Sequence, residues 1–140
     1  MNTFLPLISV CLLSLASLSA KAQNLLPQAD GDKVALNAMI EMPRAYISGI
    51  CIMIKDGSLI KGSLFNEFGI SALDFIFDTD KDKVKITAAM TFIDKWYIKS
   101  VLRRDMKSLL HGLEQGQCTY TNTKRKIVYQ FSVLDDDTQR

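Results

Sequence analysis

The chain has 140 residues, of which 48% are hydrophobic and 23% are charged, the balance of an ordinary globular protein rather than of a disordered or collagen-like one. Its formal net charge is only +2 at pH 7, which argues against a nucleic-acid binder that works by neutralising phosphates. At this length we expect one domain whose hydrophobic core requires neither a metal ion nor several disulfides.

The amino end has the pattern of an export signal. An apolar run over residues 4–18 is followed by Ala20, Lys21 and Ala22, an A-x-A cleavage triplet. The run is short for a membrane span, so we predict a cleaved signal peptide at 1–22, with an uncleaved anchor as the alternative. Cys11 lies inside the run and not at the cleavage point, so no lipid attachment is expected. The mature domain is then exported to the periplasm or the periphery of the outer membrane.

The first part of the mature chain contains a leader and one ambiguous segment. Residues 23–33 include Pro27 and Gly31 and carry few apolar side chains, so we expect a flexible leader. Residues 34–42 are mostly apolar and suit either a short helix or a strand. Pro43 ends that segment.

The middle of the chain predicts an antiparallel meander. Strand-like segments cover 45–54, 59–65, 70–77 and 84–90. The first two are joined by Asp56 and Gly57, the strongest short hairpin signal in the chain, and Gly62 indicates a bulge or a close approach. In the third segment Phe75 and Phe77 alternate with Asp74, Ile76 and Asp78 and are expected to face the core.

A helix and a hairpin complete the predicted domain, which covers 34–134. Apolar side chains recur at helical spacing through 92–114, with Thr91 as the expected N-cap and Gly112 or Gly116 as the stop. Residues 119–122 and 127–134 are predicted to form the closing hairpin. Residues 135–140 form a charged tail.

The residues that could carry chemistry form no recognisable catalytic or metal-binding motif. Cys51 and Cys118 could form one disulfide or remain two buried thiols. His111 is the only histidine, and near a helix end it is a favourable cation or a solvated side chain unless it finds a nucleophile in space. The acidic turn 78–82 lacks the glycine and distal glutamate of a calcium loop. We therefore expect no enzyme activity, no cofactor and no metal site.

Four basic side chains follow one face of the predicted helix. They lie at i, i+4 spacing and could contact anionic lipid headgroups or an acidic partner: Lys95, Lys99, Arg103 and Lys107. The alternative is a solvated helix face, because Asp94 and Asp105 dilute the charge.

Several segments together resemble a known family. They are Ile47–Ile50, Phe65–Gly69, Phe75–Phe77, Asp94–Ile98 and Leu102–Met106. This pattern is similar to small exported proteins of Bacteroidetes-type bacteria that are distantly related to the lipoprotein-sorting factors LolA and LolB, most specifically at the turn Asn66, Glu67, Phe68 and Gly69. The resemblance implies an α+β fold, in which one long amphipathic helix packs on the concave face of a curved antiparallel sheet that forms an incomplete barrel.

The resemblance also implies a function, because the concave face of the sorting factors holds acyl chains. We therefore expect a non-enzymatic envelope protein that binds a lipid or a lipoprotein acyl chain in an apolar groove between sheet and helix. The basic helix face would contact the headgroup or allow peripheral membrane contact. The alternative is a closed-core module that interacts with another envelope protein through a surface or a sheet edge. The expected lining of the groove is Ile50, Ile52, Leu64, Phe75, Phe77 and Leu102.

Overall fold

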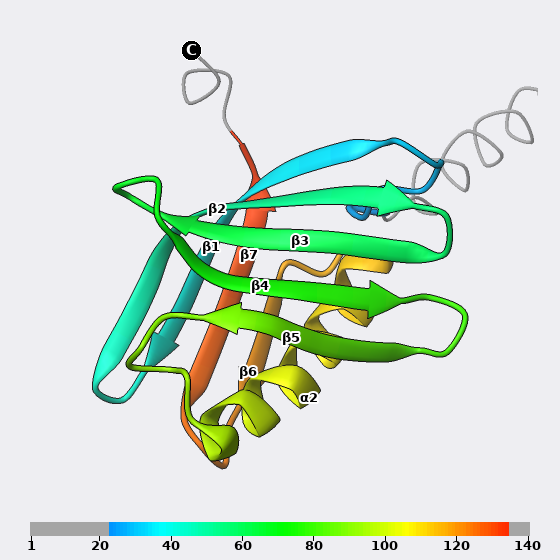
Figure 1. Ribbon diagram of the computed structural model, residues 1–140. Coiled ribbons are helices and arrows are strands. Elements are labelled where there is room, and N and C mark those ends of the chain that lie inside the picture. Colours follow the sequence, from blue (N-terminus) through cyan, green and yellow to red (C-terminus); the bar gives the residue numbers. More distant parts are fainter. Residues whose placement is uncertain (1–22, 135–140) are drawn as a thin grey trace, which may run out of the picture.

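The computed structural model describes residues 23–134, so the predicted signal peptide (1–22) and charged tail (135–140) lie outside the described residues. The described part contains seven strands and one helix (Figure 1). Their bounds are β1 Lys33–Met42, β2 Ala45–Asp56, β3 Leu59–Asn66, β4 Ser71–Asp78, β5 Lys83–Ala89, α2 Trp96–Glu114, β6 Thr119–Asn122 and β7 Ile127–Val133. The fold class is therefore α+β, as the sequence predicts.

The seven strands form one antiparallel sheet that curls into a half-barrel (Figure 1). The strand order is β5-β4-β3-β2-β1-β7-β6, so the first five strands make a meander and the closing hairpin returns to pair β7 with β1. The two edge strands are β5 and β6. The predicted curved antiparallel sheet is confirmed.

Residues 34–42, which the sequence leaves open between helix and strand, belong to strand β1. Leu36, Ala38 and Ile40 are buried and alternate with more exposed neighbours, the period of two that a strand requires. The predicted hairpin at Asp56 and Gly57 is also confirmed. Asp56 pairs with Leu59, and Gly57 adopts φ 59°, a value that glycine reaches without steric cost.

The predicted close approach at Gly62 is confirmed. Gly62 pairs with Phe75 across β3 and β4, and a Cβ at this position would overlap the ring of Phe75. Because the ring covers the glycine backbone, only a residue without a side chain fits here.

Helix α2 starts later than the sequence predicts. Its N-cap is Lys95, which makes no side-chain capping hydrogen bond, so the expected Thr91 cap is wrong. The cause is Ile93, which is completely buried and draws residues 90–95 into turns, with Ile93 N donating to Met90 O at 3.0 Å. The helix end agrees better with the prediction, because Gly116 adopts φ 80° and donates to Leu113 O at 3.1 Å, as in a Schellman motif.

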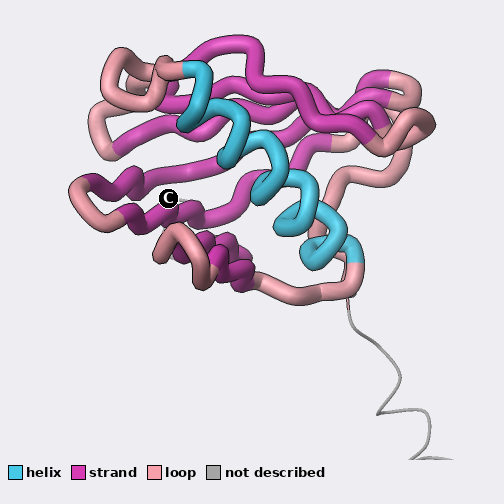
Figure 2. Tube along the Cα trace, turned by 90° about the horizontal axis from the view of Figure 1, so that it is seen from below, coloured by secondary structure: helices cyan, strands magenta, loops and turns pink. Residues whose placement is uncertain are grey.

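The core is formed by the inward faces of the strands and the apolar stripe of α2. Leu102, Met106, Leu109 and Leu113 belong to one buried cluster with the inward strand residues. The helix contacts the edge strands β5 and β6, and Figure 2 shows it running across the opening of the curled sheet.

The segment expected to be a flexible leader packs on the domain. Leu25 and Leu26 are buried in the core cluster, and Leu25 N donates to Leu113 O at 3.0 Å. Farther along, Gly31 N donates to Lys55 O at 2.8 Å. This difference from the expectation comes from two adjacent leucines, whose burial outweighs the turn-forming residues around them.

A buried carboxylate connects the helix to the closing hairpin. Asp105 on α2 is only 4% exposed. It accepts hydrogen bonds from Tyr129 Oη at 2.7 Å and from Asn122 Nδ2 at 3.0 and 3.1 Å. Burial raises the pKa of Tyr129, and the hydrogen bond and negative charge of Asp105 raise it further. The tyrosine therefore stays protonated as the donor, and this network fixes α2 against β6 and β7.

We predict that Tyr129→Phe lowers the free energy of unfolding by about 1 to 3 kcal/mol, because it leaves a buried carboxylate short of a donor. An unfolded tyrosine loses its proton near pH 10, whereas folded Tyr129 keeps it. The stability that this network contributes is therefore complete below about pH 10 and is lost as the pH rises above it. Denaturant unfolding from pH 7 to 11 measures both effects.

The matched control is Tyr46→Phe, since Tyr46 is 67% exposed and its hydroxyl group makes no hydrogen bond within residues 23–134. We expect this variant to unfold like the wild type at pH 7. Equal stability of the Tyr129 variant and the wild type would contradict the assigned role of the network.

Both cysteines of the described chain are free thiols. Strands β1 and β7 separate β2, which carries Cys51, from β6, which follows Cys118. Cys51 is fully buried, and desolvation raises the pKa of its thiol to about 12. Cys118 is partly exposed.

We predict that alkylation of the native protein at pH 8 modifies Cys118 and spares Cys51, because only a thiolate reacts and Cys51 is a buried thiol at that pH. Peptide mapping by mass spectrometry reads each cysteine separately. Adding denaturant should make Cys51 reactive. Protection of both residues until a reductant is added would instead reveal a disulfide between them.

Candidate functional site

Most of the exposed large apolar side chains gather at one end of the half-barrel. Of the eight in the described chain, six come from the start of β2, the β3–β4 turn, the β5–α2 loop and the first turn of α2. We call them the rim cluster: Tyr46, Phe68, Ile70, Phe92, Trp96 and Tyr97. Such a concentration makes this end of the domain a candidate binding surface, because apolar side chains on an ordinary surface are scattered singly.

The β3–β4 turn holds Phe68 out into solvent by a local hydrogen-bond network. Asn66 Oδ1 accepts from Phe68 N and from Ile70 N, both at 3.0 Å. Gly69 adopts φ 76° and donates to Asn66 O at 3.0 Å. Because these bonds fix the backbone, Phe68 remains 84% exposed and cannot fold back onto the core.

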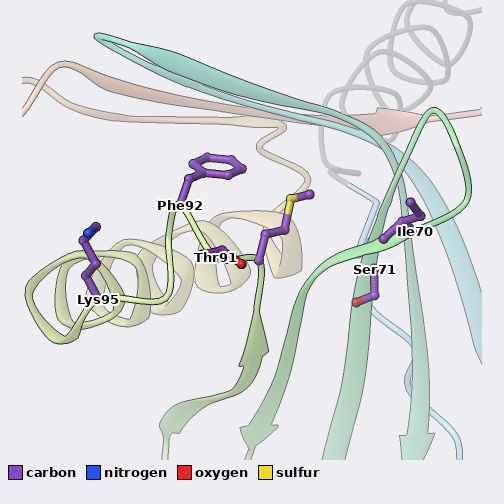
Figure 3. A pocket seen from close by; sticks show the side chains of 6 residues that line it. Ile70, Ser71, Thr91, Phe92 and Lys95 are labelled. Atoms are coloured by element: carbon purple, nitrogen blue, oxygen red, sulfur yellow. The ribbon is translucent and has the colours of Figure 1, made fainter.

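Two members of the rim cluster, Ile70 and Phe92, line an open pocket of about 670 Å³. Figure 3 shows Ile70 and Ser71 on one side of it and Phe92 and Lys95 on the other. Met90 also lines the pocket, and its N–H donates to Ala72 O at 3.0 Å, which fixes the β5–α2 loop to β4.

A smaller pocket of about 200 Å³ adjoins the first one and shares Met90 and Phe92 with it. Its other walls include Tyr46 and Phe68. The two hollows therefore share Met90 and Phe92 as walls, and together they form the candidate site, which we call the rim pocket.

None of the six residues expected to line a groove lies at the rim pocket. Four are packed in the core and are at most 2% exposed, namely Leu64, Phe75, Phe77 and Leu102. The other two, Ile50 and Ile52, alternate on β2 with the buried Cys51 and Met53, so they point to the opposite, outer face of the sheet. The structure therefore does not bring the six together.

Sequence reasoning missed the rim pocket because its residues lie where periodicity ends. Met90 and Phe92 fall between a strand and a helix, and Phe68 lies in a turn. The available signal was an apolar aromatic residue inside the polar turn between β3 and β4, where a solvated loop is expected to be hydrophilic.

The predicted basic residues divide between two places. Lys95 lines the rim pocket. Lys99, Arg103 and Lys107 line two openings between α2 and the edge strand β5, of about 360 and 370 Å³, which share Val84 and Arg103. The strand adds Lys83 and Lys85 to the same walls. We call this channel the basic groove.

His111 is held by an acidic side chain from the turn between β4 and β5. Its Nε2 lies 2.6 Å from Asp82 Oδ1, and Lys107 Nζ lies 3.3 Å from Asp82 Oδ2. Although desolvation opposes the shift, hydrogen bonds with His111 and Lys107 and their charges lower the pKa of Asp82. The rings of His111 and Phe77 also meet edge to face, with their centroids 5.9 Å apart. These contacts tie the turn to α2.

Within residues 23–134, no group of three or more His, Cys, Asp or Glu side chains is placed to hold a metal ion. The same residues contain no helix that is both long and apolar enough to cross a membrane. Comparison of the chain with protein-family models, curated proteins and solved structures found no match.

Proposed function

We propose that this domain is an exported, non-enzymatic binding module of the cell envelope that takes an apolar chain, such as the acyl chain of a lipid or lipoprotein, into the rim pocket. The observation that carries the proposal is the 670 Å³ hollow between Ile70, Met90 and Phe92. Its size lies in the range of small-molecule sites, about 300 to 1,000 Å³. Apolar walls favour an apolar occupant.

The polarity of the walls supports an amphiphilic ligand. Lys95 supplies the cationic group at the pocket and Thr91 supplies a hydroxyl group, whereas the hydroxyl group of Ser71 donates to Asp74 Oδ1 at 2.6 Å. An acyl chain would cover the apolar walls while its carboxylate or ester oxygens met these groups. Each methylene group of the chain that is buried there contributes about 0.8 kcal/mol before the cost of association.

The similarity to LolA and LolB supports the same ligand class by analogy of fold. A curled antiparallel sheet with a single long helix agrees with that architecture, and the turn that carries the strongest sequence similarity, Asn66 to Gly69, borders the rim pocket. In this domain the interior is filled by core side chains such as Leu64 and Phe75. We therefore place the acyl chain at the rim instead of between sheet and helix.

We predict that Ile70→Glu weakens binding of a fluorescent palmitate analogue at least about tenfold, because it introduces a charge into an apolar wall. Fluorescence titration of the mature protein measures the dissociation constant. Ile54→Glu is the matched control, since Ile54 is also an exposed isoleucine but lies at the other end of β2. Absence of binding by the wild type, or equal weakening in both variants, would contradict the proposal.

A second candidate is an interaction module for another envelope protein. One observation favours it: the outer face of the sheet carries an apolar row in which Ile50 pairs with Phe65 and Ile52 pairs with Ala35. Photo-crosslinking from position 52 in the native envelope would capture a discrete protein if this face is the interface. Lipid capture from position 70 with no protein captured from position 52 would favour the rim pocket.

A further inference from the structure

The basic groove carries a local concentration of positive charge. Six basic side chains line its two openings: Lys83, Lys85, Lys99, Arg103, Arg104 and Lys107. Two of them are paired, Lys99 with Asp94 at 2.8 Å and Lys107 with Asp82 at 3.3 Å. The other four form no ion pair within residues 23–134. Since the whole chain has a net charge of only +2, this excess is local.

The geometry of the groove comes from the edge of the half-barrel. Strand β5 contributes one wall and the polar face of α2 contributes the other. Val84 and Ile86 line the apolar floor. The basic side chains of the helix wall therefore lie beside this apolar floor, whereas Lys83 and Lys85 alternate with Val84 and Ile86 along β5 and point to the outer side of the strand.

An exposed aromatic pair stands at the start of the helix wall. Trp96 lines the groove and is 81% exposed, and Tyr97 is 52% exposed. Their rings meet edge to face with centroids 5.7 Å apart. Trp and Tyr are enriched where a protein meets the boundary between lipid and water, because their rings have an apolar body and a polar edge.

We propose that the α2–β5 face is a peripheral docking surface for an anionic phospholipid bilayer. In this arrangement Trp96 and Tyr97 enter the interfacial layer, and the basic side chains of the groove contact headgroup phosphates. Basic residues combined with interfacial aromatic residues are the recognition chemistry of such a membrane.

The observations favour a bilayer over other acidic partners. From Lys99 to Lys107 the helix wall rises about 12 Å, which is short for a nucleic-acid track. A purely acidic peptide would satisfy Arg103 and Lys85 but would leave Trp96 in water. A headgroup layer with acyl chains beneath it accommodates both kinds of side chain.

The docking surface is separable from the rim pocket. Trp96, Arg103 and Lys85 do not line the pocket, whereas Ile70 and Met90 do not line the groove. Lys95 belongs to the pocket and is left unchanged in the experiment. The inference therefore stands whether or not an acyl chain enters the rim pocket.

The test measures binding of the mature protein to phosphatidylglycerol-containing vesicles and to phosphatidylcholine vesicles, by sedimentation and by tryptophan emission. Trp96 is the only tryptophan in the chain, so its emission reports directly on the proposed contact. We expect a blue shift and salt-sensitive binding with the anionic vesicles alone. Trp96→Ala should lower the partition coefficient about tenfold.

The charge variant is Lys85→Glu with Arg103→Glu, two exposed residues without an ion pair in the described chain. We expect at least a 30-fold loss of partitioning, because each basic side chain near an anionic surface contributes about a factor of five. The matched control is Lys33→Glu with Lys124→Glu, two exposed positions outside the groove, which changes the net charge equally. This control should bind within about threefold of the wild type.

Three results would overturn the proposal: equal binding to both kinds of vesicle, unchanged Trp96 emission, or equal losses in the charge variant and its control. Displacement from vesicles by millimolar glycerol phosphate would also overturn it, by revealing a small-anion site. Thermal unfolding of every variant checks that the fold is intact. The palmitate titration is independent of the vesicle assay. Binding to vesicles without binding of palmitate would support membrane docking and contradict the rim pocket. Binding of palmitate without binding to vesicles would support the rim pocket and contradict membrane docking.

Discussion

One helix must cover both edges of an incomplete barrel, and the rest of the structure depends on this constraint. The strand order leaves β5 and β6 at the two edges of the sheet, and α2 contacts both. Its apolar stripe closes the core, while Asp105 anchors it to the closing hairpin through Tyr129 and Asn122. Burying a carboxylate without hydrogen-bond donors costs free energy. The network therefore fixes the orientation of α2 as well as attaching it to the hairpin.

Closing the core moves any apolar site to the end of the barrel. Phe75 covers Gly62 so closely that even a Cβ has no room there, and Leu102 packs from the helix into the same cluster. A ligand between sheet and helix would have to displace such side chains, at a cost of several kcal/mol for each large one. At the rim the chain leaves Ile70 and Phe92 exposed, so a ligand there displaces only water.

Periodicity predicted the strands and the body of the helix, because alternation in β4 and the 3.6-residue repeat in α2 are set by burial on one face. It failed at Thr91, where Ile93 enters the core and delays the helix. Periodicity also could not identify the inward face of β2, because apolar residues occupy both faces of that strand. The pairing of β2 with its neighbours determines that Cys51 points toward the core and Ile52 points outward. The basic face of the helix could be predicted from the sequence. The position of Lys85 beside that helix could not, because it depends on which strand lies at the edge of the sheet.

The late start of α2 has a further structural effect, because it sets the relation between the two candidate surfaces. With the helix beginning at Trp96, the preceding loop is free to place Phe92 and Lys95 at the rim pocket, and the first helical turn places Trp96 and Lys99 at the basic groove. If the helix began at Thr91, all of these side chains would instead project from the same helix axis. The burial of Ile93 therefore separates the rim pocket from the basic groove while keeping the two adjacent.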